Sequence, residues 1–333
     1  MSPQLHAAAS ESLPARIRAG LRRRFAPPTI VLLYHRVAPG VDQDVNQLAT
    51  RPENFAAHLA WLADHARPVP PAEFVRRHAR PAPRGLVLDG GKPRVLITFD
   101  DGYADNVHHA LPLLVKHGFR ALGFVTTGQI GSTEPFWWDA LERIVFAGRP
   151  ATGGWKLPDG TLVPDYLDKP ATYSILHAAL KRLADPDRRS ALAELAGQGG
   201  VSPRTTDDSR AMNWGELRAW AAVGMLVGAH SRSHPVLTAL TTDELRAEIR
   251  SCKRDLESRL GVVTDAFAYP YGSRNAYDER CVAAVRAAGF CCAFVNRPGN
   301  ARWARSPYTL PRFLVRDWSG NEFAARFEEW CRG

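Results

Sequence analysis

The chain has few cysteines and no long hydrophobic run, and both absences narrow what it can be. Its five cysteines include no CxxC pair, so neither a disulfide framework nor a zinc knuckle is expected. We expect the adjacent Cys291 and Cys292 to be core thiols in a strand. No stretch approaches the roughly 18 apolar residues of a membrane-spanning helix, and the first 25 residues lack the apolar core of a cleaved secretion signal. The expected compartment is therefore the cytoplasm.

What the sequence does have is the composition of a globular protein. Of its 333 residues, 45% are hydrophobic and 23% are charged, which is close to the globular average and excludes disorder as the main state. This length suits one large α/β domain or two modest ones. The net charge of +9 favours phosphate-rich partners, but no nucleic-acid recognition motif is present, so nucleic acid is not expected as a partner.

The densest basic run lies between residues 16 and 24. Ile17, Leu21 and Phe25 recur every four residues among arginines, a pattern that predicts a helix. That helix could lie on an anionic membrane surface, at the inner membrane face, or it could be a solvated helix packed loosely on the protein. We treat residues 1–28 as a basic extension and 29–333 as the main domain.

Short buried strands alternate with helices along the rest of the chain. The expected strands are TIVLLYH (29–35), PRVLITFDDG (93–102), ALGFVTT (121–127), MLVGAHS (225–231), DAFAYPYG (265–272), CCAFV (291–295) and TLPRFLV (309–315). The expected helices cover 52–65, 105–117, 241–261, 277–288 and 321–331. This alternation predicts βαβ units around a mainly parallel sheet, and the number of buried strands favours a barrel. Residues 129–210 interrupt this alternation of strands and helices. They contain an expected hairpin at 155–163 and two weakly predicted helices, so we expect an insertion that could face the substrate.

Three polar features stand at the ends of expected strands, where parallel α/β folds place their sites. They are the adjacent acids Asp100 and Asp101, the pair His230 and His234, and the turn Tyr269-Pro270-Tyr271-Gly272. Alone, each has an ordinary explanation: solvated loop acids, surface histidines and a packing turn. Together, two histidines and one carboxylate form a ligand set typical of zinc with open positions. The second carboxylate is then free to act as a base, which predicts metal-assisted hydrolysis.

TFDDG, HSRSH and YPYG resemble, in this order, the first three motifs of the polysaccharide deacetylases, which are the family-4 carbohydrate esterases with the nodulation-type deacetylase domain. The resemblance covers about 29–127 and 211–330. It implies a distorted (β/α) barrel of about seven parallel strands, one divalent metal, for which Zn²⁺ is our choice, and removal of N-acetyl groups from amino sugars. It also implies roles for single residues: Asp100 as the general base, Asp101, His230 and His234 as the metal ligands, and the Tyr271 N–H after Pro270 as an oxyanion donor.

Two departures from the family pattern matter. The third motif does not open with an arginine, and no histidine follows His234. However, LLYHRV (32–37) resembles the YHxV segment of the permuted deacetylases that act on poly-N-acetylglucosamine, which implies that His35 is the general acid. Histidines on expected helices or in the insertion, among them His177, are set aside because they lie away from strand ends. Candidates to support Asp100 or His35 are Arg312, Arg316 and Asp317, which could equally form ordinary ion pairs.

We therefore expect a metal-dependent hydrolase that removes N-acetyl groups from an amino sugar in a polysaccharide, an oligosaccharide or a lipid-linked precursor. In this mechanism a metal-bound water attacks the amide, Asp100 is the base and His35 protonates the departing amine. A catalytically silent glycan-binding relative is the alternative, which the presence of both Asp100 and Asp101 disfavours. A non-haem iron oxygenase also uses two histidines and a carboxylate, but its HxD spacing is absent.

Overall fold

The computed structural model describes residues 27–332 except for 42, 80–90, 151–152 and 203–208. The basic helix predicted near the N-terminus lies outside the described residues, so it stays a prediction. Among the described helices, none combines the length and the apolar character that crossing a membrane requires. All five cysteines are free thiols.

The central sheet is parallel and follows the order β11-β10-β9-β6-β5-β1-β12, with β4 paired to β5. Its strands are β1 (Thr29–Tyr34), β4 (Arg67–Pro68), β5 (Arg94–Phe99), β6 (Ala121–Val125), β9 (Leu226–Ala229), β10 (Ala266–Ala268), β11 (Cys292–Phe294) and β12 (Phe313–Leu314). Every residue of β1 and β5 is buried, as their continuous apolar sequences predict for strands covered on both faces. All the strands expected from the sequence are present.

The segment that leads into β12 closes the sheet. Leu310 forms backbone hydrogen bonds with Ala293 in β11 and with Val295 just after it, while β12 pairs with β1. The two ends of the sheet are therefore joined through one stretch of chain. The architecture is the expected distorted (β/α) barrel.

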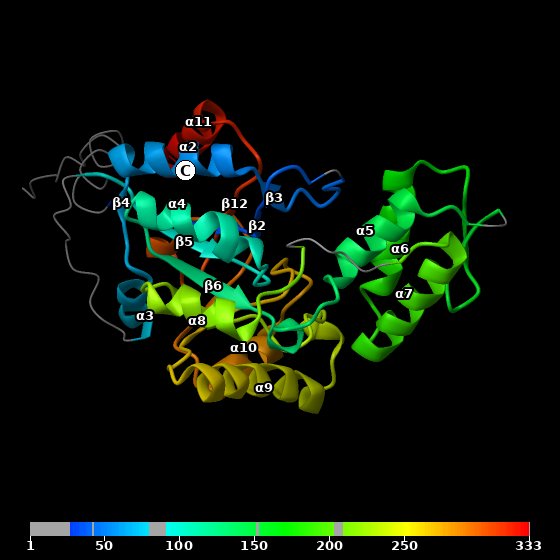
Figure 1. Cartoon of the computed structure of the whole chain (residues 1–333). Coiled ribbons are helices and arrows are strands. Elements are labelled where there is room, and N and C mark those ends of the chain that lie inside the picture. The colour runs from blue at the N-terminus through cyan, green and yellow to red at the C-terminus, as the bar shows by residue number, and fades with distance from the viewer. Residues whose placement is uncertain (1–26, 42, 80–90, 151–152, 203–208, 333) are drawn as a thin grey trace, which may run out of the picture.

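Helices cover the outside of the barrel (Figure 1). They are α2 (Pro52–His65), α3 (Pro71–Ala79), α4 (Leu111–Lys116), α8 (Trp214–Ala222), α9 (Thr242–Leu260), α10 (Glu279–Ala287) and α11 (Gly320–Arg332). The expected helix start and stop of α9 are confirmed: Thr241 and Glu244 form a reciprocal capping box, and Gly261 ends the helix in the left-handed conformation. The helix expected over 105–117 begins instead with a π-helical turn, η1 (Asn106–Ala110).

Residues 129–210 are called the insertion below, and the part of them that the structure describes contains three helices and a hairpin. They are α5 (Trp137–Ala147), β7 (Gly154–Lys156), β8 (Leu162–Pro164), α6 (Lys169–Leu180) and α7 (Asp185–Gly199). The predicted hairpin is confirmed, whereas three helices replace the two expected. Their apolar residues form a hydrophobic cluster apart from that of the barrel, and Figure 1 shows α5, α6 and α7 grouped to one side. A short pair, β2 (Arg36–Val37) with β3 (Ala49–Thr50), follows β1.

Candidate active site

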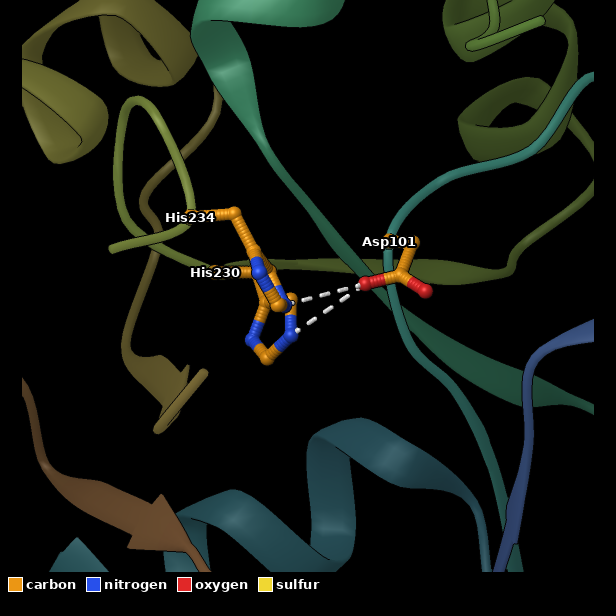
Figure 2. Close-up of side chains that lie close together, drawn as sticks. All are labelled: Asp101, His230 and His234. Carbon is orange, nitrogen blue, oxygen red and sulfur yellow. Dashed lines mark ion pairs between the residues drawn. The ribbon is translucent and has the colours of Figure 1, made fainter. Parts of the chain in front are cut away.

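The loops after β5 and β9 bring Asp101, His230 and His234 together, as the sequence predicts. Figure 2 shows the two imidazoles facing one oxygen of the Asp101 carboxylate. Asp101 Oδ1 lies 3.5 Å from His230 Nε2 and 3.4 Å from His234 Nε2. All three residues are buried, and one potential ligand atom from each lies within 4.8 Å of the others.

This donor set fits a divalent metal ion. Ligand atoms held about 2.1 Å from a tetrahedral zinc ion lie about 3.4 Å apart, which matches both distances above. The Nδ1–H of His230 donates to the carbonyl of Ala268 in β10 at 2.8 Å, which leaves Nε2 as the lone-pair nitrogen that faces Asp101. Such a bond to the far nitrogen is what orients metal-binding histidines.

The two loops that carry these side chains, and the Tyr269–Gly272 turn after β10, hold strained backbone conformations. Five described residues other than glycine have positive φ, and four of them lie here: Asp101 (71°), Ser231 (61°), His234 (56°) and Tyr271 (62°). Each such conformation costs of order 1–3 kcal/mol and persists where the surrounding structure enforces it, most often at functional sites. The clustering therefore supports a functional role for these three loops independently of the side-chain chemistry.

Asp100 is held by Arg312, which is one of the three supports proposed from the sequence. The Arg312 guanidinium is fully buried and donates to both carboxylate oxygens at 2.7 Å. Burial raises the pKa of the Asp100 carboxyl, but the charge and hydrogen bonds of Arg312, together with the neighbouring His230 and His35, more than offset burial and hold that pKa below its ordinary value. Asp100 is therefore ionised at neutral pH. Arg312 immediately precedes β12, so the arginine that contacts Asp100 comes from a different part of the chain than the position before the YPYG turn.

Replacing Arg312 by methionine should lower the free energy of unfolding by about 3–5 kcal/mol, because it leaves the Asp100 charge buried without a partner. Urea denaturation of the metal-free protein at neutral pH measures this loss. The double variant Arg312→Met/Asp100→Asn is the control, since it removes both charges and should recover much of the stability. A loss below about 1 kcal/mol in the single variant would show that the pair is not needed to compensate a buried charge.

His35 lies in the same pocket as the metal-ligand cluster, at the end of β1. Its backbone carbonyl accepts a hydrogen bond from Asn106 Nδ2 at 2.9 Å, and Asp105 pairs with the neighbouring Arg36 at 2.8 Å. Burial lowers the pKa of His35, while the charges of Asp101 and Asp100 partly oppose this effect. The imidazole is therefore neutral at neutral pH in the metal-free protein and close to both carboxylates. Sequence reasoning missed Asp105 and Asn106, although they lie only three and four residues after TFDDG.

The site opens into a pocket of about 270 Å³. Tyr271 and Arg316 line it, as does His35. Arg316 donates to the carbonyls of Asn46 and Gln47 and does not contact Asp100. Asp317 is not part of this pocket, because its carboxylate binds Arg51 and Asn54 at the start of α2. Of the three proposed supports, only Arg312 contacts the predicted base.

The insertion forms one wall of this pocket through Trp138, His177 and Lys181. The Trp138 ring lies 4.8 Å from that of His234. Setting His177 aside from the site was wrong, because the insertion folds back over the strand ends. No local signal in the sequence indicates this contact.

Arg188 ties the insertion to the metal-ligand loop. Its guanidinium is 1% exposed and donates to the carbonyl of Ser233, between the two histidines, and to Asp185. It also lies over the Trp137 ring at 5.3 Å. Because the bond to Ser233 joins a buried side chain of α7 to the loop after β9, Arg188 indicates that the insertion is docked against the site.

Comparison with known proteins agrees with this geometry. A family model described as "Polysaccharide deacetylase" matches residues 88–155 and 202–293, which include the loops after β5, β9 and β10. A curated protein of Bacillus subtilis (strain 168), "Putative polysaccharide deacetylase YxkH", is 22% identical over 303 residues, covering 90% of this chain and 75% of that protein.

Solved structures share the fold. The deacetylase PplD of Streptococcus pyogenes, determined in complex with acetate, superposes with a TM-score of 0.59 at 18% identity and covers 90% of this chain and 98% of its own. IcaB from Ammonifex degensii superposes with a TM-score of 0.58 at 21% identity and covers 92% of this chain and 98% of its own. At these identities the likeness establishes the barrel architecture, and the assignment to the YHxV subgroup stays a prediction.

Proposed function

Because this chain belongs to the polysaccharide deacetylase family, we propose that it is a metal-dependent hydrolase that removes N-acetyl groups from an amino sugar. One observation carries the proposal. A buried Asp101–His230–His234 cluster shares a single pocket with a second carboxylate, Asp100, that is bound at 2.7 Å by Arg312 and lies 3.9 Å from His230. The substrate class that this chemistry suits is an N-acetylated polysaccharide, oligosaccharide or lipid-linked precursor.

In this proposal the two adjacent acids have different roles: Asp101 binds the metal and Asp100 is the general base. A divalent ion on Asp101, His230 and His234, for which we propose Zn²⁺, supplies Lewis acidity to the acetyl carbonyl and lowers the pKa of water. Asp100 accepts the proton of the attacking water, because Arg312 keeps its carboxylate ionised without occupying every lone pair. Arg312 thus positions the base and does not itself react.

Tyr271 and His35 complete the proposed machinery. Among the described residues, none accepts a hydrogen bond from the Tyr271 N–H, so this donor is available to the oxygen that gains negative charge. The departing amine needs a proton, and we assign its delivery to His35. A neutral imidazole must first gain a proton during the reaction, and the water proton taken by Asp100 is a source close by.

Acetate release from N-acetylglucosamine oligomers, measured with and without a chelator, tests the function. We expect release that stops when the metal is removed and returns when zinc is added. Bound metal without acetate release from any glycan would overturn the proposal and would indicate a glycan-binding relative instead.

The division between the acids gives a sharper prediction. Asp100→Asn should keep the metal but lower kcat at least about 10²-fold, because it removes the general base. Asp101→Asn should instead weaken metal binding, because an amide oxygen is a poorer zinc ligand than a carboxylate. Metal content by elemental analysis and kcat are measured on both variants. If the two variants behave alike in both assays, the assigned roles are wrong.

A further inference from the structure

Lys181, at the end of α6, is a cation in the active-site pocket that the proposed chemistry does not use. It lines the pocket and is half-buried, and its Nζ lies 3.7 Å from the centre of the Tyr271 ring. The same ring also contacts His234, 4.7 Å away between ring centroids. The Lys181 ammonium is therefore one aromatic ring away from the metal-ligand cluster.

No carboxylate among the described residues pairs with this ammonium. Burial lowers the pKa of Lys181, which is the effect of losing water without gaining an anionic partner. The ring of Tyr271 offers only a partial replacement, since a cation–π contact at such a site contributes about 0.5–2 kcal/mol. The ammonium thus retains donors that a ligand could satisfy.

Both carboxylates of the pocket, Asp100 and Asp101, already have partners. Asp100 is held by both nitrogens of Arg312, and Asp101 faces the two histidines. The other cation of the pocket, Arg316, donates from Nη1 to the backbone carbonyls of Asn46 and Gln47. The Lys181 ammonium, by contrast, has no hydrogen-bonding partner among the described residues, so it is the cation more readily available to a group brought by the substrate.

We propose that Lys181 binds an anionic group, a carboxylate or a phosphate, that the substrate carries close to its acetamide. This inference rests on the proposed function and narrows its substrate class to acidic or phosphorylated N-acetyl sugars. A neutral sugar leaves the half-buried ammonium without a counter-charge, whereas a carboxylate or phosphate oxygen forms a charge-assisted hydrogen bond with it. Lys181 is then a residue that determines specificity and takes no part in bond cleavage.

Binding of three related sugars to the zinc-loaded full chain tests the proposal by calorimetry. The probes are N-acetylglucosamine, which is neutral, N-acetylmuramic acid, which adds a carboxylate next to the acetamide, and N-acetylglucosamine 1-phosphate, which adds a phosphate next to the acetamide. We expect at least one anionic sugar to bind about 10–100-fold more tightly than the neutral one, the range for a hydrogen bond to a charged group. Which of the two is preferred identifies the anion.

The variants separate Lys181 from other sources of anion binding. Lys181→Gln should reduce the anionic-to-neutral ratio of dissociation constants about 10-fold or more, and Lys181→Arg should keep it within about threefold, because it keeps the charge. Arg182→Gln is the matched control, since it removes the same charge from the next, exposed position and should leave the ratio unchanged. A purely structural role for Lys181 would weaken all three sugars equally.

Two results would overturn the proposal. One is a wild-type protein without preference for either anionic sugar. The other is a preference that persists in Lys181→Gln, which would place the anion on the metal or on Arg316. The acetate-release assay reports separately on the proposed function, because a protein could discriminate between these sugars without hydrolysing any glycan.

Discussion

Replacing His35 by glutamine is expected to lower kcat by about 10²–10⁴-fold, the range for loss of a proton-transfer group. The fold and the bound metal should be retained, because the strand end is fixed by backbone contacts such as Asn106 to the His35 carbonyl, which glutamine preserves. Steady-state kinetics on an N-acetylated oligosaccharide, with metal content and circular dichroism, measure all three properties. The effect should shrink for an activated acetate ester, whose leaving group departs without a proton.

His177→Gln is the matched control, because His177 lines the same pocket and is not one of the proposed metal ligands. Burial and the nearby Lys181 charge lower its pKa to about 4, and it stacks on Trp137 at 4.7 Å. We therefore expect His177→Gln to change kcat much less than His35→Gln. If the order is reversed, the proton reaches the amine from the insertion and His35 is only a structural strand-end residue.

Replacing His234 by alanine is expected to abolish metal binding and reduce acetate release to background. The reason is that two remaining ligands, Asp101 and His230, seldom hold zinc tightly, since structural and catalytic zinc sites use three or four protein ligands. Zinc content after dialysis and activity at added zinc are the measurements. His65→Ala, which removes an exposed histidine at the end of α2, is the control and should leave both unchanged. One equivalent of zinc retained by His234→Ala would refute the ligand assignment.

The elements could be predicted from the sequence because their signals are local. Continuous apolar runs gave β1 and β5, the Thr241–Glu244 capping box gave the start of α9, and the motif loops placed Asp101 beside His230. These features depend on neighbours within a few positions along the chain, or on the rule that parallel strands end at one edge of the sheet.

The supports of the site could not be predicted in the same way. Arg312 and Asp100 are separated by 212 residues, and only the closure of the barrel shows that Arg312, and not Arg316 or Asp317, faces the base. The wall formed by Trp138, His177 and Lys181 depends on how the insertion docks, through buried contacts such as that of Arg188 with Ser233. Such tertiary contacts leave no periodicity or spacing in the sequence.

Residues 310–315 join the two ends of the sheet, and they are synthesised late. This determines when a growing chain can become active. The metal-ligand loops end at His234, so these ligands emerge from the ribosome before the stretch that carries Arg312 and joins β11 to β1. Pairing between segments that lie far apart in the sequence costs loop-closure entropy, so such contacts form late in folding. A nascent chain could therefore gather its metal ligands while the carboxylate of Asp100 still lacks its guanidinium. Hydrolysis would begin only when the barrel is sealed, so an incompletely folded chain would not act on the sugars around it.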